Sequence, residues 1–153
     1  MHLGHVVKAD ARWRLFAFAD AAPPDDETSR LAALGRFLET NPASPLRRHT
    51  PRGADPDSVI DCRAVLQQGF RETDISSLPP LFRPAKGMLG LTDYEKTFCP
   101  DLKNGPDLYD LRKINKEEGC IVIVRPDQYV AEILPLDGFD ELSAFFDRIL
   151  LLA

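Results

Sequence analysis

Three cysteines carry the most reactive side chains of this 153-residue chain: Cys62, Cys99 and Cys120. Their number is odd and their spacing is wide, so reduced thiols are expected rather than a disulfide framework. No two of them form the C-x-x-C pair that thiol exchange and most zinc clusters use. The sequence therefore predicts neither thiol redox activity nor a zinc site of that kind.

Other polar side chains have the types needed for acid–base chemistry or ligand binding. Two histidines, His2 and His5, are spaced for one helical face. No third ligand lies nearby, so they predict an N-terminal arm and no metal site. Five further residues are candidates for general acid–base work: His49, Asp61, Arg63, Tyr94 and Arg125.

Most of these candidates also have a structural interpretation, which the sequence favours. Asp61 and Arg63 lie two residues apart and form either part of a polar pocket or a solvated or ion-paired strand face. Arg125, Pro126 and Asp127 occupy a predicted turn, where proline fixes φ and aspartate bonds to the backbone, so a structural clasp is expected. A local basic cluster predicts a solvated loop in preference to an anion or partner site. Its members are Arg47, Arg48, His49 and Arg52.

The composition limits the class of protein. Hydrophobic residues make up 44% and charged residues 28%, which predicts a chain that folds as one domain over residues 1–153. A net charge of −5 disfavours nucleic acid as a partner. The longest apolar runs have five residues, far below the ~20 that a membrane-spanning helix needs. No export signal is visible, so the cytoplasm is the expected location.

The first third of the chain reads as a strand, a helix and a loop. The strand covers residues 12–20 by alternation and is apolar on both faces in its later half. We expect Asp25 or Asp26 to cap the helix and Pro42 to end it. A proline-rich loop is then expected over residues 42–57.

A second alternating strand is expected over residues 59–67. It places Cys62 on the same face as Ile60 and Ala64, which predicts an inert thiol in the core. Prolines interrupt residues 69–115, so an irregular insertion with short helical turns is expected there, with an extended piece around residues 94–98.

The last third of the chain has the clearest pattern. Two apolar runs, residues 120–124 and 129–134, flank a Pro-Asp turn and predict a hairpin. We expect Asp137 to cap a final amphipathic helix. Its apolar stripe consists of Phe139, Leu142, Phe145, Phe146, Ile149 and Leu150.

This order of elements is typical of an α/β, thioredoxin-like fold with a mixed central sheet covered by helices, in the order β-α-β-α-β-β-α. A redox-active member would carry its cysteines where the first strand enters the first helix. Here residues 20–24 read DAAPP. The fold is therefore expected without its usual chemistry.

Several segments resemble the C-terminal region of the flavin-dependent aromatic hydroxylases, the family of phenol 2-monooxygenase and 3-hydroxybenzoate 4-monooxygenase. They are HLGHVVKADARWR with its continuation LFAFAD, VIDCRAVL at 59–66, DYEKTFCPD at 93–101 and IVRPDQYVA at 123–131. The resemblance covers nearly the whole chain. It implies a thioredoxin-like domain without thiol chemistry that is associated with dimerisation.

Two functions from different classes follow. The chain contains no G-x-G-x-x-G motif after a strand, so no FAD is expected in it, although the resemblance implies FAD in full-length relatives. The first function is a non-catalytic assembly module that pairs with itself or with a flavin monooxygenase catalytic chain. The alternative is a standalone, cofactor-free protein that binds an aromatic or polyketide-like substrate and catalyses cyclisation or isomerisation with the five candidate residues above.

An assembly module needs exposed apolar side chains. Two segments lack the periodicity that would commit such side chains to the core: the N-terminal arm within residues 1–10, and residues 79–101. The expected interface residues are Leu3, Val6, Val7, Leu81, Phe82, Met88 and Leu89.

Overall fold

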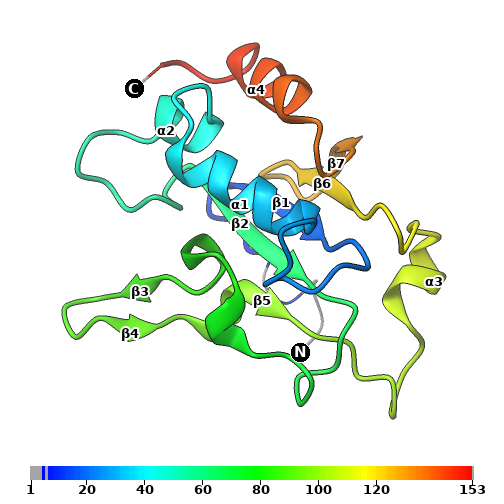
Figure 1. Ribbon diagram of the computed structural model, residues 1–153. Helices are drawn as coiled ribbons and strands as arrows, with labels where there is room; N and C mark the ends of the chain where they lie inside the picture. Colours follow the sequence, from blue (N-terminus) through cyan, green and yellow to red (C-terminus); the bar gives the residue numbers. More distant parts are fainter. Residues whose placement is uncertain (1–4, 6, 153) are drawn as a thin grey trace.

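The computed structural model describes residue 5 and residues 7–152 (Figure 1). Its centre is a five-stranded sheet with the strand order β5-β2-β1-β6-β7. The strands are β1 (Trp13–Phe18), β2 (Ile60–Val65), β5 (Thr97–Phe98), β6 (Cys120–Val124) and β7 (Val130–Leu134). β1 runs parallel to β2 and antiparallel to β6, β2 runs parallel to β5, and β6 runs antiparallel to β7. The expectation of a mixed sheet in an α/β protein is confirmed.

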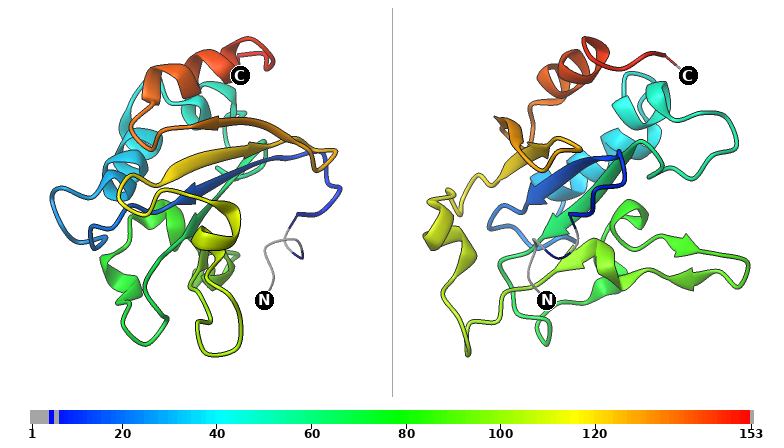
Figure 2. Two further views of the ribbon diagram at one scale, coloured as in Figure 1. Left: turned by 90° about the vertical axis from the view of Figure 1, so that its right-hand side faces the viewer. Right: turned by 180° about the vertical axis from the view of Figure 1, so that it is seen from behind.

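Helices pack on both faces of this sheet (Figure 2). They are α1 (Arg30–Thr40), α2 (Pro45–His49), α3 (Leu108–Arg112) and α4 (Phe139–Asp147), with 3₁₀ turns η2 (Ile75–Ser77), η3 (Pro80–Phe82) and η4 (Tyr94–Lys96). The larger hydrophobic cluster joins the sheet to α1, α4 and η3, and the smaller cluster joins the opposite face to α3. β1 divides its side chains accordingly, with Leu15 and Ala17 in the larger cluster and Phe16 and Phe18 in the smaller one.

The start of α1 differs from the expectation. Ser29 is the N-cap, and its side chain accepts a hydrogen bond from the backbone N–H of Ala32 at 3.2 Å. Asp20, just after β1, accepts a second one from the N–H of Arg30 at 2.9 Å. The prediction that Asp25 or Asp26 caps this helix is wrong, because the chain forms turns up to residue 28 and only then becomes helical.

The expected loop over residues 42–57 contains the short helix α2, so the loop prediction is wrong for residues 45–49. Pro45 occupies the first turn, where a missing N–H leaves no hydrogen bond unmade. The following residues bring basic side chains towards the C-terminal helix, as described below.

Aromatic contacts fix α4 on the sheet. The Trp13 ring packs edge-on against Phe145 and Phe146, each with ring centroids 5.7 Å apart. Phe37 of α1 stacks on Phe139 at 4.6 Å. The amphipathic helix is confirmed, but Gly138 rather than Asp137 is its N-cap.

The segment from 69 to 115 forms short elements instead of long ones. β5, within the expected extended piece, adds a strand to the main sheet beyond β2. β3 (Ala85–Lys86) and β4 (Leu91–Thr92) form a separate two-stranded ribbon. Tyr109 of α3 is buried, and its hydroxyl contacts the carbonyl oxygens of Val65 at 2.7 Å and Ala19 at 3.0 Å, which ties the segment to the strand ends.

Candidate interaction surface

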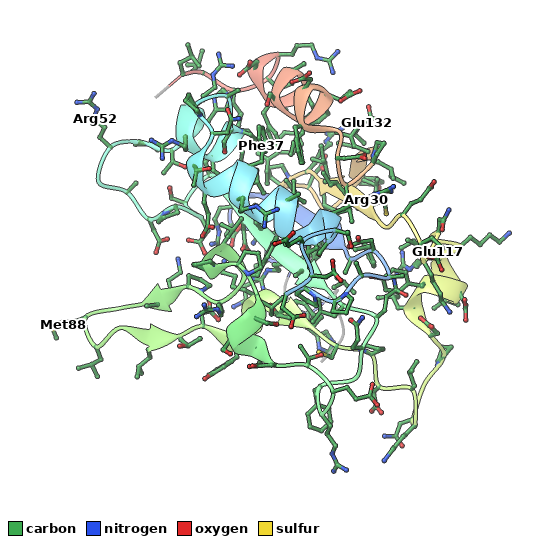
Figure 3. The ribbon with its side chains drawn as sticks, in the orientation of Figure 1. Arg30, Phe37, Arg52, Met88, Glu117 and Glu132 are labelled. Atoms are coloured by element: carbon green, nitrogen blue, oxygen red, sulfur yellow. The ribbon has the colours of Figure 1, made fainter. Side chains whose placement is uncertain are left out.

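The ribbon of β3 and β4 projects from the body of the molecule and carries apolar side chains at its tip (Figures 1 and 3). Gly87 and Gly90, both with φ near +65°, allow the four-residue turn between the strands. Met88 is 100% exposed and Leu89 is 79% exposed. Leu91 on β4 is also exposed. An apolar tip in this position faces water unless another surface covers it.

Ion pairs hold both ends of this ribbon to the body. Lys86 on β3 binds the carboxylates of Asp55 and Asp57, the latter at 2.8 Å. Lys96, which follows β4, binds Asp57 and also Asp61 of β2, the latter at 2.5 Å. Asp57 therefore connects the two ends of the ribbon.

The ion pairs continue into the interior of the protein around Asp61. This carboxylate is fully buried and accepts hydrogen bonds from Arg63 Nε at 3.1 Å and Arg63 Nη2 at 2.9 Å. Its Oδ2 also lies 3.1 Å from Nε of the buried Arg14. Arg63 donates a further hydrogen bond to the carbonyl of Glu95, at the base of the ribbon, at 2.6 Å. The polar face of β2 is thus ion-paired, and it is buried rather than solvated.

The electrostatics of Asp57 agree with this role. Burial acts to raise the pKa of its carboxyl. Hydrogen bonds with Asp55, Lys86 and Lys96, together with the charge of Lys96, outweigh burial and hold that pKa well below its usual range. The carboxylate is therefore charged near neutral pH, as the anchoring of two lysines requires.

A groove lies beside the base of the ribbon. Its volume is about 560 Å³, and it runs between α1, α2 and η3 with the residues that follow it. Its apolar lining consists of Leu38, Leu46, Ala54, Pro56, Pro80, Leu81 and Pro84, and Glu39, Arg47 and Thr50 complete it. A second cavity of about 370 Å³ shares Ala54, Pro56, Leu81 and Pro84 with it and extends beneath the ribbon to Lys86.

A family model described as "Phenol hydroxylase, C-terminal dimerisation domain" matches residues 1–153. The chain belongs to this family. It is 54% identical over 151 residues to a 3-hydroxybenzoate 4-monooxygenase of Comamonas testosteroni, covering 96% of the chain and 23% of that relative. It is 34% identical to the FAD-dependent monooxygenase terD of Aspergillus terreus, with 95% and 24% covered. It is 30% identical to the phenol 2-monooxygenase fsqG of Aspergillus fumigatus, with 94% and 23% covered. The chain therefore spans about a quarter of the length of these relatives.

The expected interface residues of this dimerisation-domain member have different fates. Met88 and Leu89 are exposed as predicted, and Leu81 and Val7 are partly buried. Phe82 is fully buried in the larger cluster, so the prediction that it stays available to a partner is wrong. The proline-rich sequence around Phe82 gave no sign of a core position. Phe82 is buried because η3 packs closely against α1, where Gly35 leaves room for Pro79. Leu3 and Val6 lie outside the described residues.

The five acid–base candidates are not gathered into one site. Asp61 and Arg63 bind each other in the interior, as described above. Tyr94 is 64% exposed. Arg125 pairs with the half-exposed Asp127 at 2.5 Å in the hairpin turn next to Pro126. This pair suits the expected clasp, which stays a prediction.

His49 has a structural environment at the C-terminal helix. Its side chain is buried, with Nε2 3.1 Å from Asp147 Oδ1 and Nδ1 2.8 Å from the carbonyl oxygen of Leu151. The neighbouring Arg48 pairs with the same Asp147. Part of the basic cluster therefore joins α2 to α4, and the prediction of a wholly solvated loop is wrong for these two residues.

The cysteines lie in unreactive surroundings. Burial raises the pKa of the Cys62 thiol well above its usual range and that of Cys120 to about 11. Burial also raises the pKa of Cys99. In the part of the chain that the structure describes, no three His, Cys, Asp or Glu side chains are grouped as a metal site. His2 lies outside that part. None of the described helices is both long and apolar enough to cross a bilayer.

The sequence did not point to the residues that hold the ribbon. Lys86, Lys96, Asp55 and Asp57 lie in segments without periodicity, and nothing in their spacing indicates that one carboxylate binds two lysines 29 and 39 residues away. Only Asp61 and Arg63, two residues apart on one strand face, were candidates from the sequence, and there they indicated a polar pocket or a solvated or ion-paired face without indicating burial.

Proposed function

We propose that this domain is a non-catalytic module that joins two copies of the chain through the exposed ribbon. The observation that carries the proposal is the fully exposed Met88 at the end of a ribbon whose base is fixed by ion pairs. A fully exposed apolar side chain has the most surface to bury, so its burial by a partner contributes the largest favourable free energy to association. Membership of a family described as a dimerisation domain supports the same reading.

The energetics favour burial of two ribbons rather than one. Burying a Leu or Met side chain fully contributes about 1.5–3 kcal/mol. The three side chains of one ribbon, Met88, Leu89 and Leu91, then contribute roughly 4.5–9 kcal/mol, and two ribbons contribute roughly 9–18 kcal/mol. Loss of translational and rotational freedom on association opposes this by roughly 4–15 kcal/mol. In a symmetric dimer that covers both tips, the free energy from burial is larger than the opposing free energy over most of the two ranges.

The relatives are about four times as long as this chain, and their additional length is relevant to where catalysis takes place. One relative is named an FAD-dependent monooxygenase, and the chain spans about a quarter of its length. We propose that flavin binding and hydroxylation of an aromatic compound belong to the other three quarters of such a protein, with this domain holding two catalytic regions together. The cytoplasm stays the predicted location.

The thioredoxin-like assignment is also a proposal. Strands β2, β1, β6 and β7 lie in that order, with a parallel first pair, and the crossover between β1 and β2 contains α1. This arrangement, followed by α4, supports a thioredoxin-like core to which β5 and the ribbon are additions. The junction of β1 with α1 carries Asp20 as a helix-capping side chain where redox-active members carry cysteines.

Sedimentation velocity over a concentration series tests the proposal. The chain should sediment at micromolar concentration as a particle of about twice 17.1 kDa. Met88→Glu should shift it towards monomer, because a carboxylate at the tip resists burial. Ile133→Glu is the matched control, since Ile133 is 60% exposed on β7, away from the ribbon. A chain that is monomeric throughout the series would contradict the module.

A further inference from the structure

We infer that the ribbon tip of one copy inserts into the groove between α1, α2 and Pro80–Pro84 of a second copy, and that the exchange is reciprocal. This inference rests on the proposed self-association and extends it, because it names the surface that receives the ribbon. The occupant of the groove is a second copy of this chain, contributing Met88 and Leu89.

The tip and the groove belong to one continuous patch. Pro84, at the base of the ribbon, lines both the groove and the adjoining cavity. A two-fold symmetric dimer uses the same patch on both copies, so a projecting element and the surface that receives it both belong to that patch. The ribbon and the groove meet this condition, because the base of one forms a wall of the other.

The tip cannot easily fill the groove of its own chain. Lys86 holds β3 to Asp55 and Asp57, and the N–H of Asp93 donates to the carbonyl of Pro84 at 2.8 Å, which closes the ribbon at its base. The ribbon therefore extends away from the body, with Met88 at its far end (Figure 3). The tip can therefore contact the groove of a neighbouring molecule more readily than the groove of its own chain.

The two surfaces also match chemically. The tip sequence from Gly87 to Leu91, GMLGL, contains no charged residue. The groove is lined mostly by leucine, proline and alanine, and its volume of about 560 Å³ has room for the two side chains at the tip. Insertion therefore places apolar groups mainly against apolar walls, and the tip itself brings no charge into the groove, whose charged lining residues are Glu39 and Arg47.

Disulfide trapping between copies that each carry one accessible cysteine tests the arrangement. In a background of Cys99→Ser and Cys120→Ser, which retains the buried Cys62, we place one new thiol at the tip, Leu89→Cys, and another at the exposed rim of the groove, Ala54→Cys. Mixed and oxidised, the two variants should form a crosslinked heterodimer. Leu89→Cys alone should crosslink poorly, because reciprocal insertion keeps the two tips apart.

Several outcomes would overturn the inference while leaving self-association intact. If Leu89→Cys alone crosslinks best, the two tips contact each other. If Ile133→Cys crosslinks to itself, the dimer forms by pairing of the β7 edges. A chain that does not associate at all would contradict the proposed function as well. Fluorescence of Trp13 shows whether each variant has folded.

A second measurement does not need new thiols. Met88→Ser removes an apolar side chain from both contacts of the dimer, so the dissociation constant should rise about 100-fold or more. Ala54→Trp narrows the groove from its rim and should weaken association at least tenfold, whereas Leu111→Trp, at an exposed position on α3 outside the groove, should not. An Ala54→Trp variant that folds and associates like the parent chain would overturn the inference.

Discussion

Replacing Asp61 with Asn tests whether the buried ion pairs stabilise the fold. The side chain keeps its shape but loses its charge and one acceptor oxygen. Three buried cations surround it: Arg14, Arg63 and Lys96. After the substitution, the three cations keep their other partners but lose the carboxylate that they have in common. The N–H groups of the new amide also face at least one of the cations. A buried charge that loses its counter-ion is strongly destabilising.

The contacts of Asp61 set the expected magnitude. Oδ1 accepts from Lys96 and Oδ2 accepts from Arg63 Nε and Nη2. One hydrogen bond to a charged group is lost or inverted where the new amide nitrogen faces Lys96, and two where it faces Arg63, each worth about 1.5–3 kcal/mol. The free energy of unfolding should therefore fall by about 3–5 kcal/mol, the range for breaking a buried ion pair from one side. At about 2–4 °C per kcal/mol, the melting temperature should fall by roughly 6–20 °C.

Urea unfolding followed by tryptophan fluorescence measures this change. Trp13 is the single tryptophan of the chain, and it lies at the start of β1, in register with Ile60 next to Asp61. Asp127→Asn is the matched control, because its ion pair with Arg125 is half-exposed and should contribute less than about 1 kcal/mol. Equal unfolding free energies for the two variants would refute the reasoning, since burial of the charge would then have no effect.

Two further predictions concern the backbone and pH. Gly119→Ala should destabilise the fold by about 3 kcal/mol or more, because φ is +64° and a Cβ would lie 2.2 Å from the carbonyl oxygen of Phe18. Gly53→Ala, with φ of +78° and open space around it, should cost only about 1–2 kcal/mol in the same thermal melts; equal losses would contradict the steric argument. Stability should also fall in acid. The pKa values of Asp10, mainly through its hydrogen bond from Arg12, and of Asp57 are lowered in the folded state, so their contribution is complete above the unfolded pKa of about 3.9 and is lost as pH falls below it. The urea midpoint should therefore drop between about pH 4 and 3, less steeply in Asp57→Asn, and a slope unchanged by that substitution would argue against the assignment.

Most of the sheet could be predicted from the sequence because its patterns are local. Alternation in β1 and β2, the β-branched run of β6 and the apolar stripe of α4 each require only neighbouring residues. Helix caps were less predictable. Ser29 and Asp20 accept hydrogen bonds from the first N–H groups of α1, although Asp20 lies nine residues before Ser29. Whether these residues or Asp26 cap the helix depends on the path of the chain after β1.

The candidate interaction surface depended on contacts that one sequence does not reveal. Met88 and Phe82 both lie in the proline-interrupted segment and look equally uncommitted, yet one is fully exposed and the other fully buried. What separates them is the packing of η3 against Gly35 of α1, a contact between residues more than forty positions apart. Absence of periodicity therefore indicated a segment that carries exposed apolar side chains but could not say which of its side chains face water.

The buried charges and the exposed apolar tip form one arrangement. A ribbon whose main-chain pairing is limited to two residues per strand has little stability of its own, so its direction must come from the body. The ion pairs from Asp61 through Lys96 and Asp57 to Lys86 supply that direction, since each lysine is held by two carboxylates and both lysines share Asp57. Replacing these ions with apolar groups could raise stability, but it would release the ribbon base from a defined position. A dimer contact made at the far end of a short ribbon needs that position to be fixed, because tip ordering would otherwise oppose association. In the proposed dimer, this requirement accounts for the charge that is buried beneath an exposed apolar tip.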